Sequence, residues 1–370
     1  MSETDNEESM LVTSTSPHIH CGSSVREIMR DVILSLVPCC LAAVYFFGWR
    51  AALLIAMCTG TTVGTEWVCR KMMKRNNTIG DLSAAVTGIL LALNLPIGIP
   101  LWQAILGSVV SIAVAKQIYG GIGYNPFNPA LIGRAFLLIS FTATMTTWNP
   151  STWMGVDLNN AEHADRIQSE TTASGHYGDK VSATDATTTA TPLGLLKESV
   201  KYGKPKPYVY DSKIRWNLYI GNVNGSIGET SKFAILIGFA WLIFRRVITW
   251  HTTVSYMGAV AVFAFCLTLV SPETAMPVDF HLLAGGALFG AVFMATDMVT
   301  SPSTKWGMVI FGIGCGVIMM VIRVVPTGAY PEGVTFAILI MDALTPLINK
   351  MTRYKRFGAR GKSVAKKVAA

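Results

Sequence analysis

The stretch GMVIFGIGCGVIMMVIRV, residues 307–324, decides the fold class, because its eighteen residues include a single charged side chain, that of Arg323. A helix of about 20 apolar residues crosses the roughly 30 Å hydrocarbon core of a bilayer. Nine other runs of comparable length and composition occur in the chain, and helix is predicted for all of them because lipid provides no water for unpaired backbone groups. The ten predicted spans cover residues 28–47, 51–69, 81–98, 101–119, 130–147, 231–248, 254–270, 281–299, 307–324 and 333–349.

The composition indicates a polytopic membrane protein. Of the 370 residues, 51% are hydrophobic and 14% are charged, compared with about 25% charged residues in soluble domains. The formal net charge of +8 is interpreted as a topology signal. No nucleic-acid ligand is predicted, because no basic patch is interleaved with aromatic residues. The seven cysteines and six histidines lack the spacing of a disulfide framework or a metal site, so neither is predicted.

The distribution of Lys and Arg gives the predicted orientation. Residues 70–75 hold four basic side chains after the second span, and residues 350–370 hold eight basic residues and no acid. The positive-inside rule places such segments in the cytoplasm, so both termini are predicted to be cytoplasmic in an inner membrane. Long loops cross the membrane largely regardless of their charge, so the polar segment 148–230 is predicted to be extracytoplasmic.

This loop divides the predicted spans into five and five. An odd number of spans in each half places the halves in opposite orientations, which is the arrangement of an inverted repeat. The predicted fold is therefore an all-α integral membrane protein with ten transmembrane helices in two inverted five-helix repeats. The predicted units are a cytoplasmic N-terminal segment (1–27), the first repeat (28–147), the extracytoplasmic loop (148–230), the second repeat (231–349) and a basic cytoplasmic tail (350–370).

The loop contains the run Asp185-Ala186-Thr187-Thr188-Thr189-Ala190-Thr191-Pro192. Thr suits the N-cap of a helix and Pro its first position, so one interpretation is an ordinary cap for a short amphipathic stretch over residues 193–200. The alternative is that Thr191 carries a phosphate group, because free N–H groups and the helix dipole at a helix N-terminus favour an anion. The spacing alone leaves both interpretations open.

Further motifs are distributed over nearly the whole chain. They are Ser16-Pro17-His18, Phe47-Gly48-Trp49, AKQIYGG at 115–121, NPFNPA at 125–130, Ser271-Pro272-Glu273-Thr274, TDMVT at 296–300 and YPEGV at 330–334. With them the sequence resembles the RnfD (RsxD) family, the D-type subunits of the Rnf ion-translocating electron-transport complex. That family is related to the B-type subunits of the sodium-translocating NADH:quinone reductase.

The resemblance implies a covalent cofactor. The family attaches FMN through a phosphoester to the last Thr of Asp-x-x-(Ser/Thr)-Gly-Ala-Thr, with the help of a separate flavin transferase outside the cytoplasm. Asp185, Thr188, Ala190 and Thr191 match this pattern, whereas Thr189 stands where Gly is usual. A Cβ at that position raises the cost of an unusual backbone conformation. Thr191 is thus expected to be the flavin-bearing, phosphorylated threonine.

The resemblance also implies a second, non-covalent flavin, riboflavin or FMN, among the spans. Asn125 and Asn128 flank a turn beside the fifth span, and Asp297 lies toward the inner end of the eighth. An ionisable residue within a span is a functional candidate. These three residues are therefore the candidate contacts of the second flavin. No catalytic acid, base or nucleophile is predicted, because the flavin itself carries the redox chemistry.

The expected function is that of a flavin-carrying subunit in a bacterial membrane complex, not catalytic alone. As the resemblance implies, this complex couples electron transfer between ferredoxin and NAD to sodium or proton transport. The expected partners are the other membrane and peripheral Rnf subunits (A, B, C, E and G types), the flavin transferase and membrane lipid. Two alternatives stay open, a urea-channel-like solute channel and a non-redox scaffold of the complex. An inverted repeat with discontinuous spans suits the channel.

Overall fold

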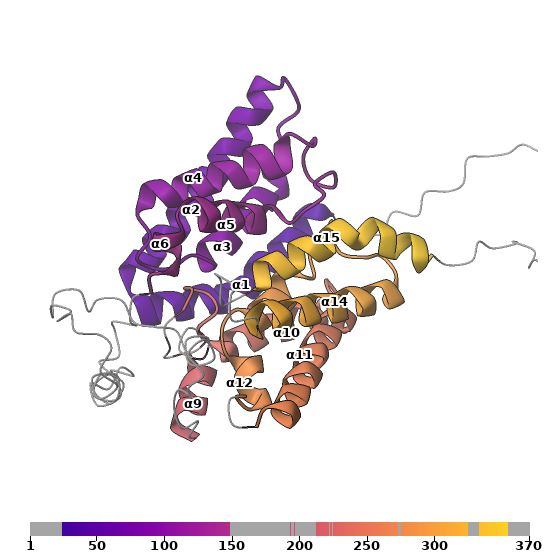
Figure 1. The fold of residues 1–370 in the computed structure, drawn as a ribbon. Helices are drawn as coiled ribbons and strands as arrows, with labels where there is room; N and C mark the ends of the chain where they lie inside the picture. Colours follow the sequence, from indigo (N-terminus) through magenta and orange to yellow (C-terminus); the bar gives the residue numbers. More distant parts are fainter. Residues whose placement is uncertain are drawn as a thin grey trace, which may run out of the picture.

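A computed structural model describes residues 24–148, 193, 196, 212–221, 223, 225–272, 275–324 and 333–353. Within these residues the regular structure is helical. The helices gather into two groups, drawn in purple and orange, which correspond to the two halves of the sequence (Figure 1).

The first group begins at α1, three residues before the predicted span at 28–47. A capping box explains this start, because the Ser24 side chain accepts from the backbone N–H of Glu27 while the Glu27 side chain accepts from that of Ser24. The helices of this group are α1 (Val25–Phe47), α2 (Trp49–Met72), α3 (Ser83–Leu93), α4 (Leu101–Ile112), which continues into the π-helical turn η2 (Ala113–Gln117), α5 (Pro129–Ser140) and α6 (Thr142–Thr146).

The second group follows a short helix, α9 (Ser212–Ile220), that lies in the predicted loop. The helical region 278–294 of this group is interrupted at Gly285, whose φ of 68° lies in the left-handed region that favours glycine. The helices are α10 (Lys232–Phe244), α11 (Trp250–Val270), α12 (Val278–Leu283), α13 (Ala287–Phe289), which runs into the π-helical turn η3 (Gly290–Met294), α14 (Lys305–Val324) and α15 (Val334–Met351).

Five of these helices, α1, α2, α11, α14 and α15, are long and apolar enough to cross a membrane. Shorter apolar helices occupy residues 83–93, 101–117, 129–140 and 232–244. The chain is therefore a multi-pass membrane protein. Each of the ten predicted ranges contains helix, but only half of them hold a helix of spanning length, so the ten-span arrangement stays a prediction.

The helix contacts follow the same order in both groups. In the first, α2 packs against α3 and α4, and α4 packs against α5. In the second, α11 packs against α12 and α14, and α14 packs against α15. The groups meet where α1 contacts α10 and where α5 contacts α15 (Figure 1). Such a correspondence is what a duplicated unit produces, and it favours the predicted repeat without fixing its orientation in a bilayer.

A close helix contact in the second group generates a test of this packing. A Cβ added at Gly312 of α14 would lie 2.0 Å from Ser255 Oγ and 2.6 Å from the backbone oxygen of Thr252, both on α11. Overpacking costs about 1–3 kcal/mol, so Gly312→Ala is expected to lower the midpoint of thermal unfolding in detergent. Gly258→Ala, also on α11 but with no atom near its added Cβ, is the control. Equal midpoints for the two variants would contradict the packing described here.

Candidate functional site

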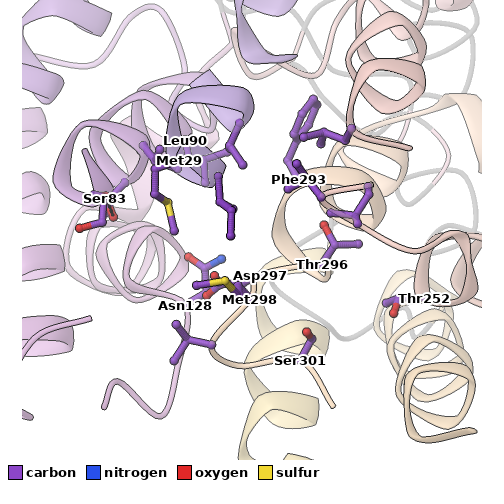
Figure 2. Close-up of a pocket in the computed structure, with 18 of the residues that line it drawn as sticks. Met29, Ser83, Leu90, Asn128, Thr252, Phe293, Thr296, Asp297, Met298 and Ser301 are labelled. Atoms are coloured by element: carbon purple, nitrogen blue, oxygen red, sulfur yellow. Dashed lines mark hydrogen bonds between the residues drawn. The ribbon is translucent and has the colours of Figure 1, made fainter. Parts of the chain in front are cut away.

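A pocket of about 310 Å³ lies where the two helix groups meet. The first group contributes residues of α1, α3, η2 and the turn before α5. The second contributes residues of α10, α11, η3, the segment after η3 and α14 (Figure 2). Ligand sites in proteins commonly occupy about 300–1,000 Å³ at such junctions. The pocket is therefore of a size that accepts a small cofactor.

Asn125 and Asn128 enter this pocket from the turn before α5. The Asn125 side chain donates to the backbone oxygen of Phe127 at 3.0 Å, which stabilises the turn. Asn128 is the N-cap of α5, where its Oδ1 accepts from the backbone N–H of Ala130 at 3.0 Å. Pro129 occupies the first helical position, for which its fixed φ is suited. Local sequence thus positions both amides.

Asp297 reaches the pocket from the opposite group, in the segment that follows η3. It is partly buried, and its Oδ2 accepts from the Thr300 hydroxyl at 3.4 Å. Figure 2 draws Asn128 and Asp297 at the lower part of the cavity, and the Asn128 side chain donates to the backbone oxygen of Met294, three residues before Asp297, at 3.4 Å. The structure therefore brings the three predicted contacts, Asn125, Asn128 and Asp297, to one pocket, although they come from distant parts of the sequence.

A buried ion pair forms one polar wall of the cavity. Lys116, on η2, lies 3.0 Å from Glu66 Oε2, and both side chains are almost fully buried. Lys116 also donates to the Ser83 hydroxyl at 2.7 Å, and Glu66 accepts from Thr78 at 2.8 Å and from Gln117 at 2.9 Å. Lys116 and Ser83 line the pocket. An ion pair so fully hydrogen-bonded can be kept in an apolar interior.

The remaining walls are largely apolar. Met29 and Leu90 face Phe293 across the cavity (Figure 2). Apolar faces with polar groups at one end suit a flat aromatic ligand whose edge carries carbonyl and N–H groups. An isoalloxazine ring has this character, so the lining is compatible with a flavin.

The residues of the predicted covalent site, Asp185, Thr188, Ala190 and Thr191, lie outside the described residues. The chain just beyond them is described at Leu193 and Leu196, which are helical and buried. They belong to a small apolar cluster with Leu218, Met276, Phe280 and Ala284. Leu193 lies so close to Gly285 that an added Cβ there would be 2.5 Å from Leu193 Cδ1. This cluster is separate from the pocket.

Several residues of the pocket are not among the predicted site residues. In the sequence Lys116 is only a topology signal, and its pairing with Glu66, 50 positions away, has no local sequence signature. Met29 and Phe293 belong to apolar runs that predict spans and nothing more. The motif AKQIYGG, which contains Lys116, is the one available signal for this wall.

Comparisons with known proteins agree with one another. The family described as NQR2, RnfD, RnfE matches residues 12–358. The D-type component of the Na(+)-translocating ferredoxin:NAD(+) oxidoreductase complex of Acetobacterium woodii is 40% identical over 94% of this chain and 95% of its own length. The D-type component of the proton-translocating ferredoxin:NAD(+) oxidoreductase complex of Clostridium ljungdahlii is 38% identical over 97% of this chain and all of its own length. The D-type component of the ion-translocating oxidoreductase complex of Escherichia coli O17:K52:H18 is 35% identical over 94% of this chain and 98% of its own length.

The Glu66–Lys116 pair generates a stability prediction. Removing one partner of a buried pair leaves an uncompensated charge and costs about 3–5 kcal/mol. Lys116→Met is therefore expected to unfold at a clearly lower temperature in detergent. The double variant with Glu66→Gln should recover part of this loss, because no buried charge is left unpaired.

The exposed pair between Arg215 and Asp279 supplies the matched control for this experiment. Exposed pairs are worth about 0–1 kcal/mol, so Arg215→Met should change the midpoint little. If Lys116→Met and Arg215→Met lower the midpoint of unfolding by the same amount, the Glu66–Lys116 pair is not buried as described.

Proposed function

The chain belongs to the NQR2, RnfD, RnfE family, and from this membership we propose how it carries electrons within an ion-translocating complex. It is a membrane subunit of an ion-translocating oxidoreductase complex and works with the other subunits of that complex. The complexes of the Acetobacterium woodii and Clostridium ljungdahlii relatives are ferredoxin:NAD(+) oxidoreductases. We infer that this chain serves the same reaction by holding flavin in two places.

The first place is Thr191, where FMN would be joined through a phosphoester by a flavin transferase. Asp185, Thr188 and Ala190 match the recognition pattern around it. The flavin supplies one- and two-electron redox chemistry, while the protein supplies attachment, position and electrostatics. Thr191 is in this proposal an anchor and takes no part in proton transfer.

The cluster formed by Leu193 and Leu196 supports this assignment. These residues are buried against α12, and two residues of chain span at most about 7 Å. A flavin on Thr191 would therefore be tethered close to the end of α12 and to Gly285. Burial of one leucine side chain contributes about 1.5–3 kcal/mol, so Leu193 and Leu196 hold their own part of the chain on the membrane domain.

The second place is the pocket between the helix groups. A non-covalent flavin, riboflavin or FMN, would lie with its ring between Met29, Leu90 and Phe293. Asn125, Asn128 and Asp297 would face its polar edge, and Lys116 would supply a positive charge. The observation that carries this proposal is that the two amides and the carboxylate line the same cavity.

The proposed topology has ten spans, both termini in the cytoplasm of a bacterial cell and the segment 148–230 outside. The pocket residues then lie toward the cytoplasmic ends of their helices, beside the basic connections. The Leu193 cluster lies toward the outer ends, beside the segment that carries Thr191. The two flavins would thus sit near opposite faces of the membrane.

A solute channel is the second candidate function. It is favoured by the position of the pocket at the junction of two helix groups and by the interrupted segment at Gly285. A channel needs no flavin, so the two functions differ in a directly measurable cofactor content. A non-redox scaffold would differ from the proposed function in the same way.

Thr191→Ala is expected to abolish the covalent flavin. The wild-type chain, produced with its flavin transferase, should fluoresce in a denaturing gel, and the variant should not, because the phosphoester oxygen is missing. Thr187→Ala, in the same run of threonines but at none of the matching positions, is the control and should stay fluorescent. A wild-type chain without fluorescence, or with an unmodified Thr191 peptide by mass spectrometry, would refute the attachment site.

Leu90→Trp is expected to remove the flavin of the pocket by filling the space opposite Phe293. The ratio of flavin released on denaturation to protein should fall from about one to near zero, while the covalent fluorescence of Thr191 remains. Val254→Trp, which places the same bulk at an exposed position of α11, should retain the releasable flavin. Equal release from both variants would show that the flavin does not lie in this pocket.

A further inference from the structure

Asp342 is a buried carboxylate outside the pocket lining. It lies near the middle of α15, an 18-residue helix, and is 2% exposed. Its Oδ2 accepts from the backbone N–H of Asn128 at 3.2 Å. Its Oδ1 is buried and has no hydrogen-bond partner. One backbone donor leaves most of the four acceptor positions of a carboxylate unused.

A second carboxylate and a hydroxyl complete a cluster of oxygen atoms. Asp297 Oδ2 accepts from the Thr300 hydroxyl at 3.4 Å. Asn128 connects this pair to Asp342, because its backbone N–H donates to Asp342 and its side chain donates to the backbone oxygen of Met294, three residues before Asp297. Asp297 and Thr300 belong to the segment after η3, whereas Asp342 belongs to α15. The cluster therefore joins two elements of the second helix group at the point where Asn128 of the first group contacts them.

The energetics of this cluster call for a positive charge. A charged side chain near the centre of a bilayer is costly and is usually paired. Neighbouring carboxylates repel each other unless a cation or proton is shared between them. Lys116 lines the adjoining pocket, but it is already paired with Glu66. The unpartnered Oδ1 of Asp342 thus marks a place for a further cation.

We propose that Asp342, Asp297 and Thr300 bind a sodium ion at the junction of the two helix groups. Carboxylate and hydroxyl oxygens are the ligands that hard cations prefer. In membrane transporters, sodium commonly binds near the midplane, beside the C-terminal end of an interrupted helix. Asp297 follows such a helix end, because it lies three residues beyond the end of η3 at Met294, and Asp342 lies near the middle of α15.

This inference rests on the proposed function and names the transported ion that the chain itself would bind. Sodium is the ion proposed because the complex of the Acetobacterium woodii relative is named for Na(+) translocation. The site also adjoins the pocket, since Asp297 and Asn128 line the pocket and Asn128 contacts Asp342. A proton is the other candidate for the same carboxylates, and the experiment below separates the two ions.

The test uses the complete complex in inverted membrane vesicles and measures ferredoxin:NAD oxidoreduction and uptake of radioactive sodium at increasing sodium concentrations. In Asp342→Asn the sodium concentration for half-maximal activity should rise by at least about tenfold, which corresponds to about 1.4 kcal/mol of lost binding. Asp342→Glu should recover part of the sodium affinity. Asp279→Asn, which removes an exposed acid outside the cluster, should match the wild type.

Wild-type sodium affinity and uptake in Asp342→Asn would overturn the proposal. Wild-type activity that does not depend on sodium, accompanied by proton uptake, would overturn the sodium assignment. The covalent fluorescence of Thr191 is measured in the same vesicles. If the wild type shows no such fluorescence but still transports sodium, the assignment of the flavin to Thr191 is refuted and the proposed sodium site is not.

A chemical measurement on the wild-type complex does not depend on the folding of a variant. A hydrophobic carbodiimide reacts with protonated carboxyl groups in apolar surroundings. Mass spectrometry should detect its adduct on Asp342. Sodium should suppress this adduct, whereas potassium at the same concentration should not. Labelling that is insensitive to sodium would contradict the proposed site.

Discussion

One asparagine joins three elements at the junction of the two helix groups. Asn128 caps α5 through its Oδ1, donates from its side chain to the backbone oxygen of Met294 at 3.4 Å, and donates from its backbone to Asp342. In a bilayer each backbone polar group needs an internal partner, because no water replaces one that is lost. The start of α5, the end of η3 and the middle of α15 are therefore fixed relative to one another.

This constraint explains why Asn125, Asn128 and Asp297 meet at one part of the pocket. Non-helical backbone at membrane depth is tolerated where it is buried in protein or lines a cavity. The turn before α5 and the segment after η3 are such pieces, and their polar groups gather at the junction. The π-helical turns η2 and η3 lie beside it and contribute Lys116 and Phe293. Turns of this kind are frequent at functional sites.

Hydropathy predicts the long helices well, because a continuous apolar run of spanning length has few alternative folds. It places α1, α2, α11, α14 and α15 within a few residues of their observed bounds. It does not predict that the range 281–299 is interrupted, because a single residue, Gly285, sets the break through its backbone conformation. Nor does it predict the Glu66–Lys116 pair, since contacts between distant residues leave no periodic pattern.

The candidate site, too, can be predicted from the sequence only in part. Asn125, Asn128 and Asp297 can be selected from the sequence as polar residues at the edges of spans, and the structure brings them together. Asp342 is also an ionisable residue within a predicted span, but nothing in the sequence shows that it lies beside Asn128, so it is not among the predicted site residues. Thr191 is identified through the resemblance of a motif, and its neighbour Leu193 proves to be buried against the membrane domain.

The placement of these groups suggests how electron transfer and ion movement could influence each other. An electron that enters the pocket brings negative charge next to Asp297, where the low dielectric strengthens Coulomb interactions. That charge would increase the affinity of the Asp342 cluster for a cation. Because coupling between two sites is reciprocal, a bound cation would favour the reduced state of the pocket by the same free energy. In the proposed function, release of the electron toward the Thr191 side would then weaken the binding of the ion, so electrostatic attraction alone would couple the two flows.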